Sequence, residues 1–556
     1  MKTITYIMIG IMSFFLQSCN AEPVDAERTN FNLLKAYTIP TNPNLSKVQG
    51  NSIQIDPTVL YSLDITPAQL VADLKKANIK SVHYFIVKFW DGSRDTDLLR
   101  EDYLNALREN NISVWLMLLG NCFYEPTTLP QEWAMEFLTP YPGLHFYSFH
   151  NDNFVDWQVE RVKRIMQNYD FVGIEFAEAY FPEWKTIETN GFYGDVSEYA
   201  RRKFTQEYLG RPGSPALDFA TIKSDAQLYS KWQDFRVDAV LNFNTKIKNA
   251  IKETDRNTLF AAWGMGVRGA TLGQIREHFG LDMVRIAQEV DPDILFVQTA
   301  SQDWSDPYLS YDYLNDYSYI VNSIRQANPD IAIGIQADIA SLSSNNPNVA
   351  KRTPEWWLNF MDLSLQSGYY TNTSYEYAFS KRQNIWIDSN INYNSPATIY
   401  KEASYTSQII AEAETPLGFV KDGNDGWQYV YTTQGLGWIN LTQGTYTITA
   451  PVDAYTSPSF YSTMQPHAFA PQTVTVVDRQ DEDWIKILTA SPYKWIYLKS
   501  PNCYYIDHPV KAYKEAVVSS EYYTFDPQLF VIADRKPGNW IEIQTASEFK
   551  WIQIDL

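Results

Sequence analysis

The hydrophobic and polar positions of this chain alternate between two patterns from about residue 52 to residue 379. Nearly all-apolar runs such as Ile112–Gly120 are typical of strands that are covered on both faces. Between them, segments such as Val155–Asn168 repeat apolar residues every three or four positions, which is typical of amphipathic helices. The apolar runs predict strands at Ser52–Asp56, Lys80–Trp90, Ile112–Gly120, the segment from Phe171, Thr258–Gly264, Asp293–Thr299, Ile331–Ala337 and Tyr369–Tyr377. The periodic segments predict helices at Pro67–Asn78, Leu98–Asn110, Val155–Asn168, Trp232–Lys252, Leu281–Glu289, Tyr311–Ala327 and Pro354–Gln366.

Eight strands with intervening helices predict an α/β fold, a (β/α)₈ TIM barrel over residues 51–390. An open doubly wound sheet is the alternative. Such a sheet normally carries a glycine-rich phosphate turn after its first strand, and none follows Ile55. The eighth helix, at Arg382–Asn392, is short and polar, so we expect the following segment to cover that end of the barrel.

The last third of the chain is a threefold repeat with a period of about 56 residues. Each copy holds two tryptophans 11 residues apart, a threonine five residues after the first, and an upstream Pro-x-x-x-Tyr. The tryptophan pairs are Trp427 and Trp438, Trp484 and Trp495, and Trp540 and Trp551. Alternating segments such as Trp484–Thr489 predict β-structure, so we expect all-β domains at 391–445, 446–502 and 503–556.

These repeats resemble bacterial SH3-like (SH3b) domains, whose final hairpin reads W-x-x-[IV]-x-T followed by x-W-[IV]. The first copy departs from this pattern with Gly435-Leu436-Gly437, where the others have Ser-Pro-Tyr or Ser-Glu-Phe. The resemblance implies attachment to a cell-wall peptide or glycan. We expect the paired tryptophans to serve as core residues more than as ligand platforms.

The first 18 residues have the features of an export signal. Lys2 precedes an apolar run, Ile4–Leu16, which is too short to span a bilayer as a mature helix. The run leads into Leu16-Gln17-Ser18-Cys19, which resembles a bacterial lipoprotein signal, with an ordinary secretory signal as the alternative. The resemblance implies acylation of Cys19 and anchoring to the bacterial cell envelope, at the outer membrane, surface or periplasmic face. Residues 19–50 are then a tether and lead-in.

The composition of the chain indicates which classes of molecule it can bind. The formal net charge is −20, which argues against nucleic acid and anionic lipid. Aromatic residues make up 15% of the chain, which suits stacking on sugar faces as well as core packing. The three cysteines and six histidines have neither a disulfide nor a zinc spacing, so we expect no metal and no cofactor.

The chemistry is expected at the carboxyl ends of the strands, where TIM-barrel active sites lie. The segment Phe171–Trp184 carries Glu175 and Glu178 at the end of a buried strand, where a carboxylate is costly unless it is paired or used. A salt-bridged structural pair with Arg201 or Arg202 is the alternative. The other strand ends contribute candidate substrate-binding side chains: Trp90, Asp91, Tyr124, Tyr180, Trp184, Trp263, Gln298, Trp304 and Tyr375.

Glycoside hydrolysis needs two carboxyl groups that flank the scissile bond. Glu178, among aromatic and apolar neighbours, suits the proton donor, because apolar surroundings favour the protonated form. Strand alternation points Glu175 into the barrel one layer below. For the second carboxylate we expect Asp338 first and Glu376 second.

The segment Tyr169–Pro182 resembles the fourth-strand signature of glycoside-hydrolase-like barrels, roughly D-G-[IV]-x-[FL]-D-[DE]-x…P, in which an acidic residue lines the sugar site. Glu178 matches the second acidic position, whereas Ala177 and Val172 replace two expected aspartates. The resemblance implies an exported glycoside hydrolase that acts on a cell-envelope or environmental glycan, with peptidoglycan as one candidate. The alternatives are a catalytically inactive carbohydrate-binding barrel and an envelope scaffold that uses its repeats.

Overall fold

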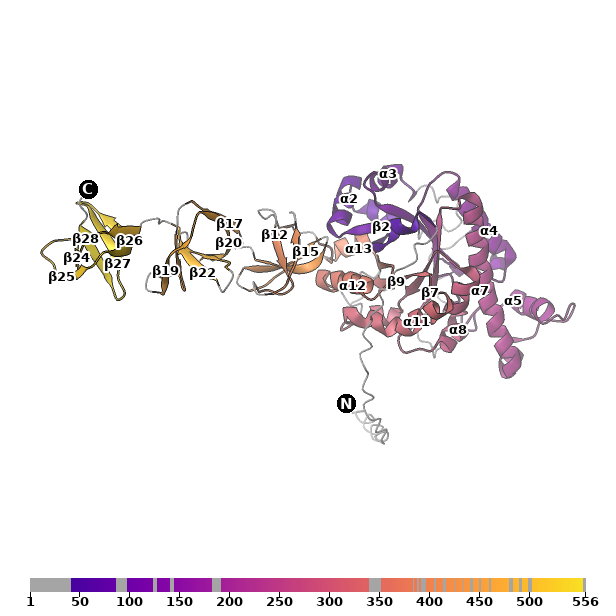
Figure 1. Ribbon diagram of the computed structural model, residues 1–556. Coiled ribbons are helices and arrows are strands. Elements are labelled where there is room, and N and C mark those ends of the chain that lie inside the picture. Colours follow the sequence, from indigo (N-terminus) through magenta and orange to yellow (C-terminus); the bar gives the residue numbers. More distant parts are fainter. Residues whose placement is uncertain are drawn as a thin grey trace, which may run out of the picture. The chain divides into compact units, whose positions relative to one another are not determined.

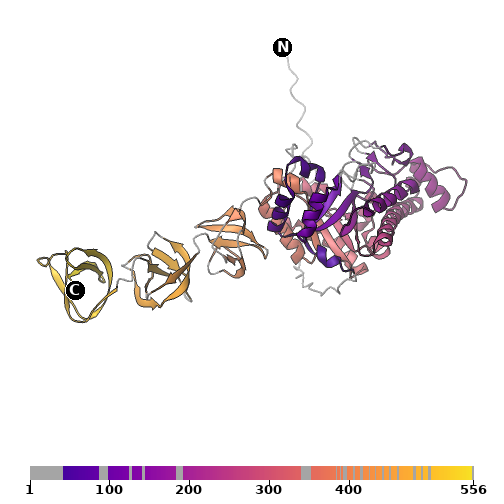
Figure 2. The same cartoon turned by 90° about the horizontal axis from the view of Figure 1, so that it is seen from above.

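The first described domain is a closed barrel of eight parallel strands in the order β1-β10-β9-β8-β7-β6-β3-β2 (Figures 1 and 2). The computed structural model describes residues 42–86, 98–123, 128–140, 145–182, 192–339, 352–383, 385–387, 390–391 and, with short gaps, 397–553. The barrel confirms the predicted α/β TIM-barrel fold, and the open-sheet alternative is wrong. The strands are β1 Gly50–Ile55, β2 Ile79–Ile86, β3 Ser113–Leu119, β6 Gly173–Ala177, β7 Leu259–Met265, β8 Ile294–Gln298, β9 Ala332–Asp338 and β10 Thr371–Tyr375.

Helices surround the strands, and local sequence accounts for most of their starts. Thr66 and Gln69 form a capping box at the start of α2, Thr271 and Gln274 do the same for α8, and the Asp225 side chain caps α7. The helices are α1 Pro57–Ser62, α2 Pro67–Lys76, α3 Glu101–Glu109, α4 Asp152–Met166, α5 Glu198–Lys203, α6 Phe219–Ser224, α7 Ala226–Thr254, α8 Leu272–Phe279, α9 Met283–Arg285, α10 Ser301–Trp304, α11 Ser318–Ala327, α12 Pro354–Gln366 and α13 Tyr377–Arg382.

The last helix of the barrel differs from the prediction. It is α13, which begins directly after β10, and not a helix over Arg382–Asn392. Ile385, Trp386 and Ile387 follow it as buried members of the barrel's hydrophobic cluster. The helix starts early because the Glu376 side chain caps it, which a search for apolar periodicity does not detect.

Large side chains fill the barrel interior. His83 of β2 stacks on Trp115 of β3, and Trp263 of β7 stacks on Phe296 of β8 with ring centroids 4.6 Å apart. Gly173 is required beside this layer, because a Cβ there would lie 2.2 Å from the Trp115 ring. The interior is therefore a packed core, and the carboxyl ends of the strands are where active sites of this fold lie.

Three six-stranded antiparallel sheets follow the barrel, and they fit the predicted SH3-like repeats. Their orders are β11-β14-β15-β16-β12-β13, β17-β20-β21-β22-β18-β19 and β23-β26-β27-β28-β24-β25. The strands of the first are β11 Asn390–Ile391, β12 Ala397–Tyr400, β13 Ile409–Ala413, β14 Leu417–Asp422, β15 Trp427–Thr432 and β16 Gly435–Asn440. Those of the second are β17 Gly444–Ile448, β18 Val452–Tyr455, β19 Met464–Phe469, β20 Gln472–Arg479, β21 Trp484–Ile487 and β22 Lys494–Tyr497. Those of the third are β23 Cys503–Ile506, β24 Val510–Tyr513, β25 Tyr522–Phe525, β26 Gln528–Lys536, β27 Trp540–Gln544 and β28 Phe549–Gln553.

The repeated sequence motif has a packing explanation. In every copy, the tyrosine of Pro-x-x-x-Tyr packs edge-on against the first tryptophan: Tyr400 on Trp427, Tyr455 on Trp484 and Tyr513 on Trp540. All three of these tryptophans are buried. The first tryptophan of each pair is thus a structural residue, as expected.

The first repeat packs against the barrel. Tyr431 of β15 is buried in the barrel's hydrophobic cluster, and its hydroxyl accepts a hydrogen bond from Asn51 Nδ2 of β1 at 3.3 Å. The backbone N–H of Leu436 donates to the Asp362 carboxylate of α12 at 3.4 Å. Gly435, with φ of 110°, allows this approach, because a Cβ there would lie 3.1 Å from Asp362 Oδ2. The glycine-containing turn that sets the first repeat apart is therefore part of its contact with α12.

The stability of the protein is expected to fall as pH rises, because the buried Asp362 carboxyl then becomes charged. Burial raises the pKa of Asp362 from 3.8 to about 6, so the folded protein binds more protons than the unfolded chain between those values. Stability present below pH 4 is then lost as pH rises through 6. Asp362→Asn keeps an acceptor for Leu436 and removes the charge. It should flatten this slope and raise the free energy of unfolding at pH 8 by about 1–3 kcal/mol.

Calorimetric melting at several pH values measures the effect. Glu355→Gln is the matched control on α12, because its ion pair with Lys421 is exposed and should contribute little. An Asp362→Asn protein with the wild-type pH slope would contradict the prediction.

Candidate active site at the carboxyl end of the barrel

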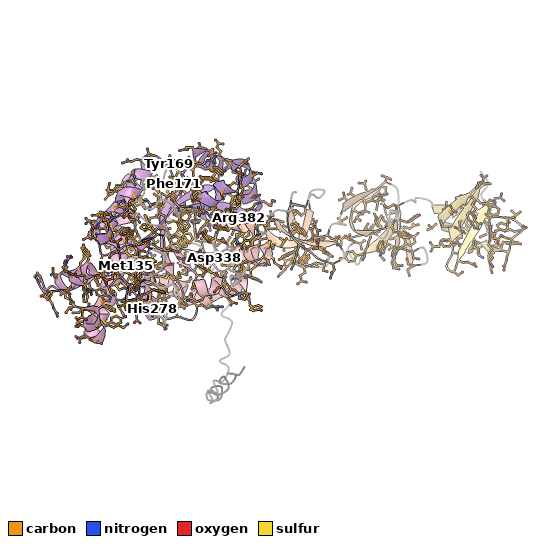
Figure 3. All side chains as sticks on the ribbon, turned by 180° about the vertical axis from the view of Figure 1, so that it is seen from behind. Met135, Tyr169, Phe171, His278, Asp338 and Arg382 are labelled. Carbon is orange, nitrogen blue, oxygen red and sulfur yellow. The ribbon has the colours of Figure 1, made fainter. Side chains whose placement is uncertain are left out.

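Four strand ends bring carboxylates together around one tyrosine. Asp338 is the last residue of β9 (Figure 3), Asp56 directly follows β1, and Glu178 directly follows β6. Tyr375 is the last residue of β10 and lies beside Asp338 in the β9–β10 register. The carboxylates within electrostatic range of the Tyr375 hydroxyl are those of Glu376, Asp56, Asp338 and Glu178.

The surroundings of Tyr375 keep its hydroxyl protonated. Burial raises the pKa of its hydroxyl well above the usual value, and the surrounding carboxylates raise it further. Tyr375 therefore stays protonated and can donate a hydrogen bond into the cluster. Its ring packs edge-on against Phe85 of β2 at 6.3 Å. Glu178 and Asp338 approach this tyrosine from strands that β7 and β8 separate, so they come from different walls of the barrel.

Glu178 has an unusual backbone and a thiol neighbour. Its φ is 56°, in the left-handed region that non-glycine residues seldom adopt, and such strained positions concentrate at functional sites. The side chain is largely buried and hydrogen-bonds with the thiol of Cys122, the first residue of β4 (Cys122–Phe123). Burial raises the pKa of this thiol, and the neighbouring Glu178 carboxylate raises it further. Cys122 is therefore a neutral neighbour of Glu178.

Glu376 caps the N-terminus of α13. Its two carboxylate oxygens accept hydrogen bonds from the backbone N–H groups of Ala378 at 2.8 Å and Phe379 at 2.7 Å. The side chain is fully buried, and burial raises its pKa to about 8. As the N-cap of α13, Glu376 is less suited than Asp338 to act on a substrate.

Glu175 lies inside the barrel, one layer below this cluster. One carboxylate oxygen hydrogen-bonds with His83 Nδ1, and the other accepts the Trp263 indole N–H at 2.8 Å. His83 Nε2 lies 2.7 Å from Ser52 Oγ, whose proton goes to the Asn372 carbonyl. His83 must then donate at Nε2, so this hydrogen-bond chain runs from Asn372 through Ser52 and His83 to Glu175.

This network shows that Glu175 forms no salt bridge with Arg201 or Arg202, the alternative given above. Arg201 instead donates to the carbonyls of Val196 and Leu217, and Arg202 pairs with Glu198. Glu175 is therefore paired, but with Trp263 of the adjacent strand β7 and His83 of β2, two strands away on its other side.

Glu175→Gln is expected to lower the free energy of unfolding by about 1–3 kcal/mol, because one amide hydrogen would lose a buried partner. Urea denaturation measures the loss. Glu160→Gln is the control, since its ion pair with Lys163 is exposed on α4. Unchanged stability of Glu175→Gln together with abolished activity would instead place Glu175 in the chemistry.

The structure corrects the predicted aromatic pocket. Trp263 was expected to wall the sugar site, but it is 1% exposed, hydrogen-bonded to Glu175 and stacked inside the barrel. It faces inward because it lies in mid-strand, two residues before the end of β7. Trp304 is half-buried on α10 and donates its indole N–H to Thr299 Oγ1 at 2.8 Å. Trp90, Asp91, Tyr124, Trp184 and Cys19 lie outside the described residues.

Two other predicted residues lie together. The Tyr180 hydroxyl donates to Gln298 Oε1 at 3.2 Å, which joins the segment after β6 to the end of β8. Both side chains are buried, so they support the cluster from below more than they face solvent. Asp303 is held by the Tyr317 hydroxyl and, at 2.9 Å, by Arg268 Nε. Burial raises its pKa, and its bonds indicate a structural residue.

Sequence reasoning missed Asp56 and Cys122. Asp56 is the last residue of the predicted strand Ser52–Asp56, and no role was predicted for it. In the structure it caps α1, since its carboxylate accepts the Thr58 N–H at 2.8 Å. Its place at a strand end was the signal that could have identified it. Cys122 carried no local signal, because its contact with Glu178 depends on the turn after β3.

The described residues contain no cluster of three or more histidine, cysteine, aspartate or glutamate side chains arranged to hold a metal ion. In the same part of the chain, no helix has the length and hydropathy needed to cross a bilayer.

These features define a TIM-barrel protein with a carboxylate-lined carboxyl end. No model of a known protein family matches the chain. It is 30% identical over 156 residues to an uncharacterized cell wall amidase of Bacillus anthracis, which covers 26% of this chain and 29% of that protein. The chain thus spans less than a third of that relative's length.

Its structural neighbours are glycoside hydrolases. The glycoside hydrolase domain of PgaB from Bordetella bronchiseptica aligns with a TM-score of 0.45 and 15% identity, covering 60% of this chain and 96% of that one. A β-galactosidase of Halorubrum lacusprofundi aligns with a TM-score of 0.44 and 11% identity, covering 59% and 52%. At these identities the likeness concerns the fold alone, so the activity has to be argued from the site.

Proposed function

We propose that this protein is an exported glycoside hydrolase whose acid is Glu178 and whose second carboxylate is Asp338. The observation that supports the proposal is that the carboxylates of Glu178 and Asp338, at the ends of β6 and β9, both act electrostatically on the Tyr375 hydroxyl. Two carboxyl groups from different walls of a barrel can flank a glycosidic bond, which is the arrangement this reaction needs.

The roles follow from the surroundings of each group. Glu178 is largely buried and next to a neutral thiol, which suits a group that must carry a proton to the leaving oxygen. Asp338 ends β9 and would act as nucleophile or as base toward water. Tyr375, which stays protonated beside Asp338, would orient a substrate hydroxyl or the Asp338 carboxylate. By the general rule, a carboxyl separation of about 5–5.5 Å gives retention and about 6.5–9.5 Å gives inversion. We favour retention.

The substrate we propose is a glycan of the cell envelope or of the surroundings, with peptidoglycan as one candidate. The local similarity to a protein named a cell wall amidase and the SH3-like repeats favour a cell-wall polymer. The formal charge of −20 makes nucleic acid an unfavourable partner.

A screen of the full-length protein against disaccharides, peptidoglycan and host glycans tests this function. Release of reducing ends supports a hydrolase. Retention of a glycan without release would support the alternative, a catalytically inactive carbohydrate-binding barrel, which Ala177 and the lack of an Asn-Glu pair on the fourth strand favour.

We further propose that acylated Cys19 anchors the protein to the cell envelope. Cys19→Ala is expected to move the protein from the membrane fraction to the soluble fraction, because a lipid chain supplies the membrane affinity. Immunoblots of fractionated cells measure this. Ser18→Ala is the control, since it keeps the thiol. Unchanged fractionation of Cys19→Ala would rule this anchor out.

A further inference from the structure

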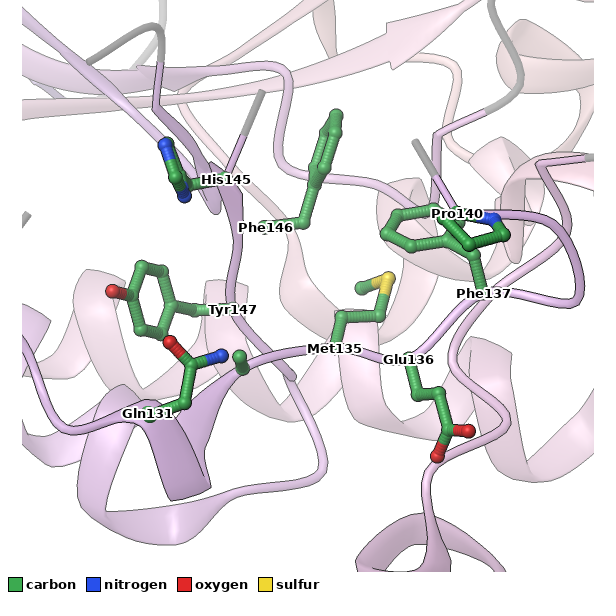
Figure 4. Close-up of a pocket in the computed structure, with 9 residues that line it drawn as sticks. Gln131, Met135, Glu136, Phe137, Pro140, His145, Phe146 and Tyr147 are labelled. Carbon is green, nitrogen blue, oxygen red and sulfur yellow. The ribbon is translucent and has the colours of Figure 1, made fainter. Parts of the chain in front are cut away.

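A cavity of about 320 Å³ lies in the segment that joins β3 to α4 (Figure 4). One wall is the short strand β5, His145–Phe146, with Tyr147 after it. The other is the segment Gln131–Pro140, which begins with a single helical turn at Gln131–Trp133. The volume is at the lower end of the range for small-molecule sites in proteins.

The walls of the cavity combine apolar and polar groups as a sugar ring requires. Met135, Phe137 and Phe146 supply an apolar face, with the two phenylalanine rings packed edge to face at 5.2 Å. Gln131 and His145 also line the cavity, and as residues they are exposed, whereas the Glu136 side chain points away from it (Figure 4). An amide and an imidazole can bind hydroxyl groups by donating and accepting hydrogen bonds. Neither lysine nor arginine is among the described lining residues, so the cavity offers an anionic ligand no cationic partner.

Backbone hydrogen bonds hold the two walls in place. The Met135 N–H donates to the Phe146 carbonyl at 2.8 Å, and the Ser148 N–H donates to the Trp133 carbonyl at 2.9 Å. The Glu136 N–H donates to Asp195 Oδ1 at 3.1 Å. A cavity with walls tied at several points is preformed, so a ligand would spend little free energy on ordering it.

The cavity is joined to the proposed acid by one step of a β-ladder. Phe146 of β5 is paired with Cys122 of β4, and the Cys122 thiol hydrogen-bonds with Glu178. Directly opposed residues of an antiparallel pair place their side chains on the same face, about 5 Å apart at Cα. Phe146 is thus one pair removed from the residue that contacts the proposed proton donor.

We propose that this cavity is a subsite that binds a neutral sugar unit of the glycan chain whose scissile bond lies at Glu178. The inference rests on the proposed function and adds that the substrate is an oligomer or polymer, with at least one unit bound outside the barrel mouth. A disaccharide at the bond would leave the subsite empty, whereas a hexasaccharide would reach it.

The double variant Gln131→Ala/His145→Ala tests the subsite, because both residues line the cavity and are exposed, so their loss should not disturb folding. Each hydrogen bond to a ligand that is lost corresponds to a roughly 2–10-fold effect. For hexasaccharides we expect a rise in KM of about tenfold with little change in kcat, and a much smaller effect on disaccharides. Glu132→Gln is the matched control, since Glu132 is exposed on the same helical turn and does not line the cavity.

Measurement of glycan affinity tests the subsite independently of catalysis. Calorimetric titration of hexa-N-acetylchitohexaose into wild-type protein and into both variants gives dissociation constants without turnover. About tenfold weaker binding by the double variant alone supports the subsite, even if the wild type cleaves nothing and the hydrolase proposal fails. Equal affinities for the three proteins, or no saturable binding to the wild type, would overturn the subsite and leave the hydrolase proposal standing on its own screen.

Discussion

Glu178→Gln is expected to lower kcat by roughly 10²–10⁴-fold, the usual contribution of a positioned general acid. The substitution keeps the shape of the side chain and a hydrogen-bonding partner for Cys122, and it removes the transferable proton. Substrate affinity should stay nearly unchanged, because the neutral amide resembles the protonated acid. Release of reducing ends measures kcat, and titration with a glycan measures affinity.

Glu175→Gln is the matched comparison on the same strand. If Glu178→Gln keeps full activity while Glu175→Gln abolishes it in a folded protein, the assignment of the acid is inverted. A further comparison is Asp338→Asn, which should also lose turnover. If none of these changes matters, the candidate site is not the catalytic centre, and Asp56, the other carboxylate near Tyr375, is the next residue to change.

Removal of the contact between the first repeat and the barrel is expected to have the largest effect on stability. Tyr431→Ala should lower the free energy of unfolding by about 3–5 kcal/mol, because it leaves a cavity in the barrel's cluster and removes the partner of Asn51. Tyr431→Phe, which keeps the ring, should cost only about 1 kcal/mol. Urea denaturation of the full-length chain measures both.

A chain that ends at Ser395 extends the test, since it lacks Tyr431 altogether. We expect it to fold with reduced stability, as the barrel has its own closed sheet and core. Complete insolubility of this chain, with the full-length protein soluble, would mean that the first repeat completes the barrel's core. Tyr431→Ala with wild-type stability would mean that the contact contributes nothing.

The local pattern of apolar and polar residues was sufficient to predict the architecture. Strand and helix periodicities are encoded residue by residue, so the eight strands and the three repeats could be read directly, and the closed order β1-β10-β9-β8-β7-β6-β3-β2 follows from that alternation. The same reading placed Glu178, Asp338 and Tyr375 at strand ends. Because parallel strands share one carboxyl end, their convergence could be expected from sequence position alone.

Side-chain contacts between different strands could be known only from the tertiary structure. Trp263 and Glu175 lie 88 residues apart in the sequence and form a hydrogen bond inside the barrel. Trp263 is therefore a core residue and not part of the wall of a ligand site. Glu376 became a helix cap because α13 starts immediately after β10, and Cys122 met Glu178 through the turn after β3. Sequence patterns thus determined which face or end of an element a residue occupies. Closure of the barrel decided which residues are partners, because hydrogen bonds and packing depend on distances between segments that the local pattern does not contain.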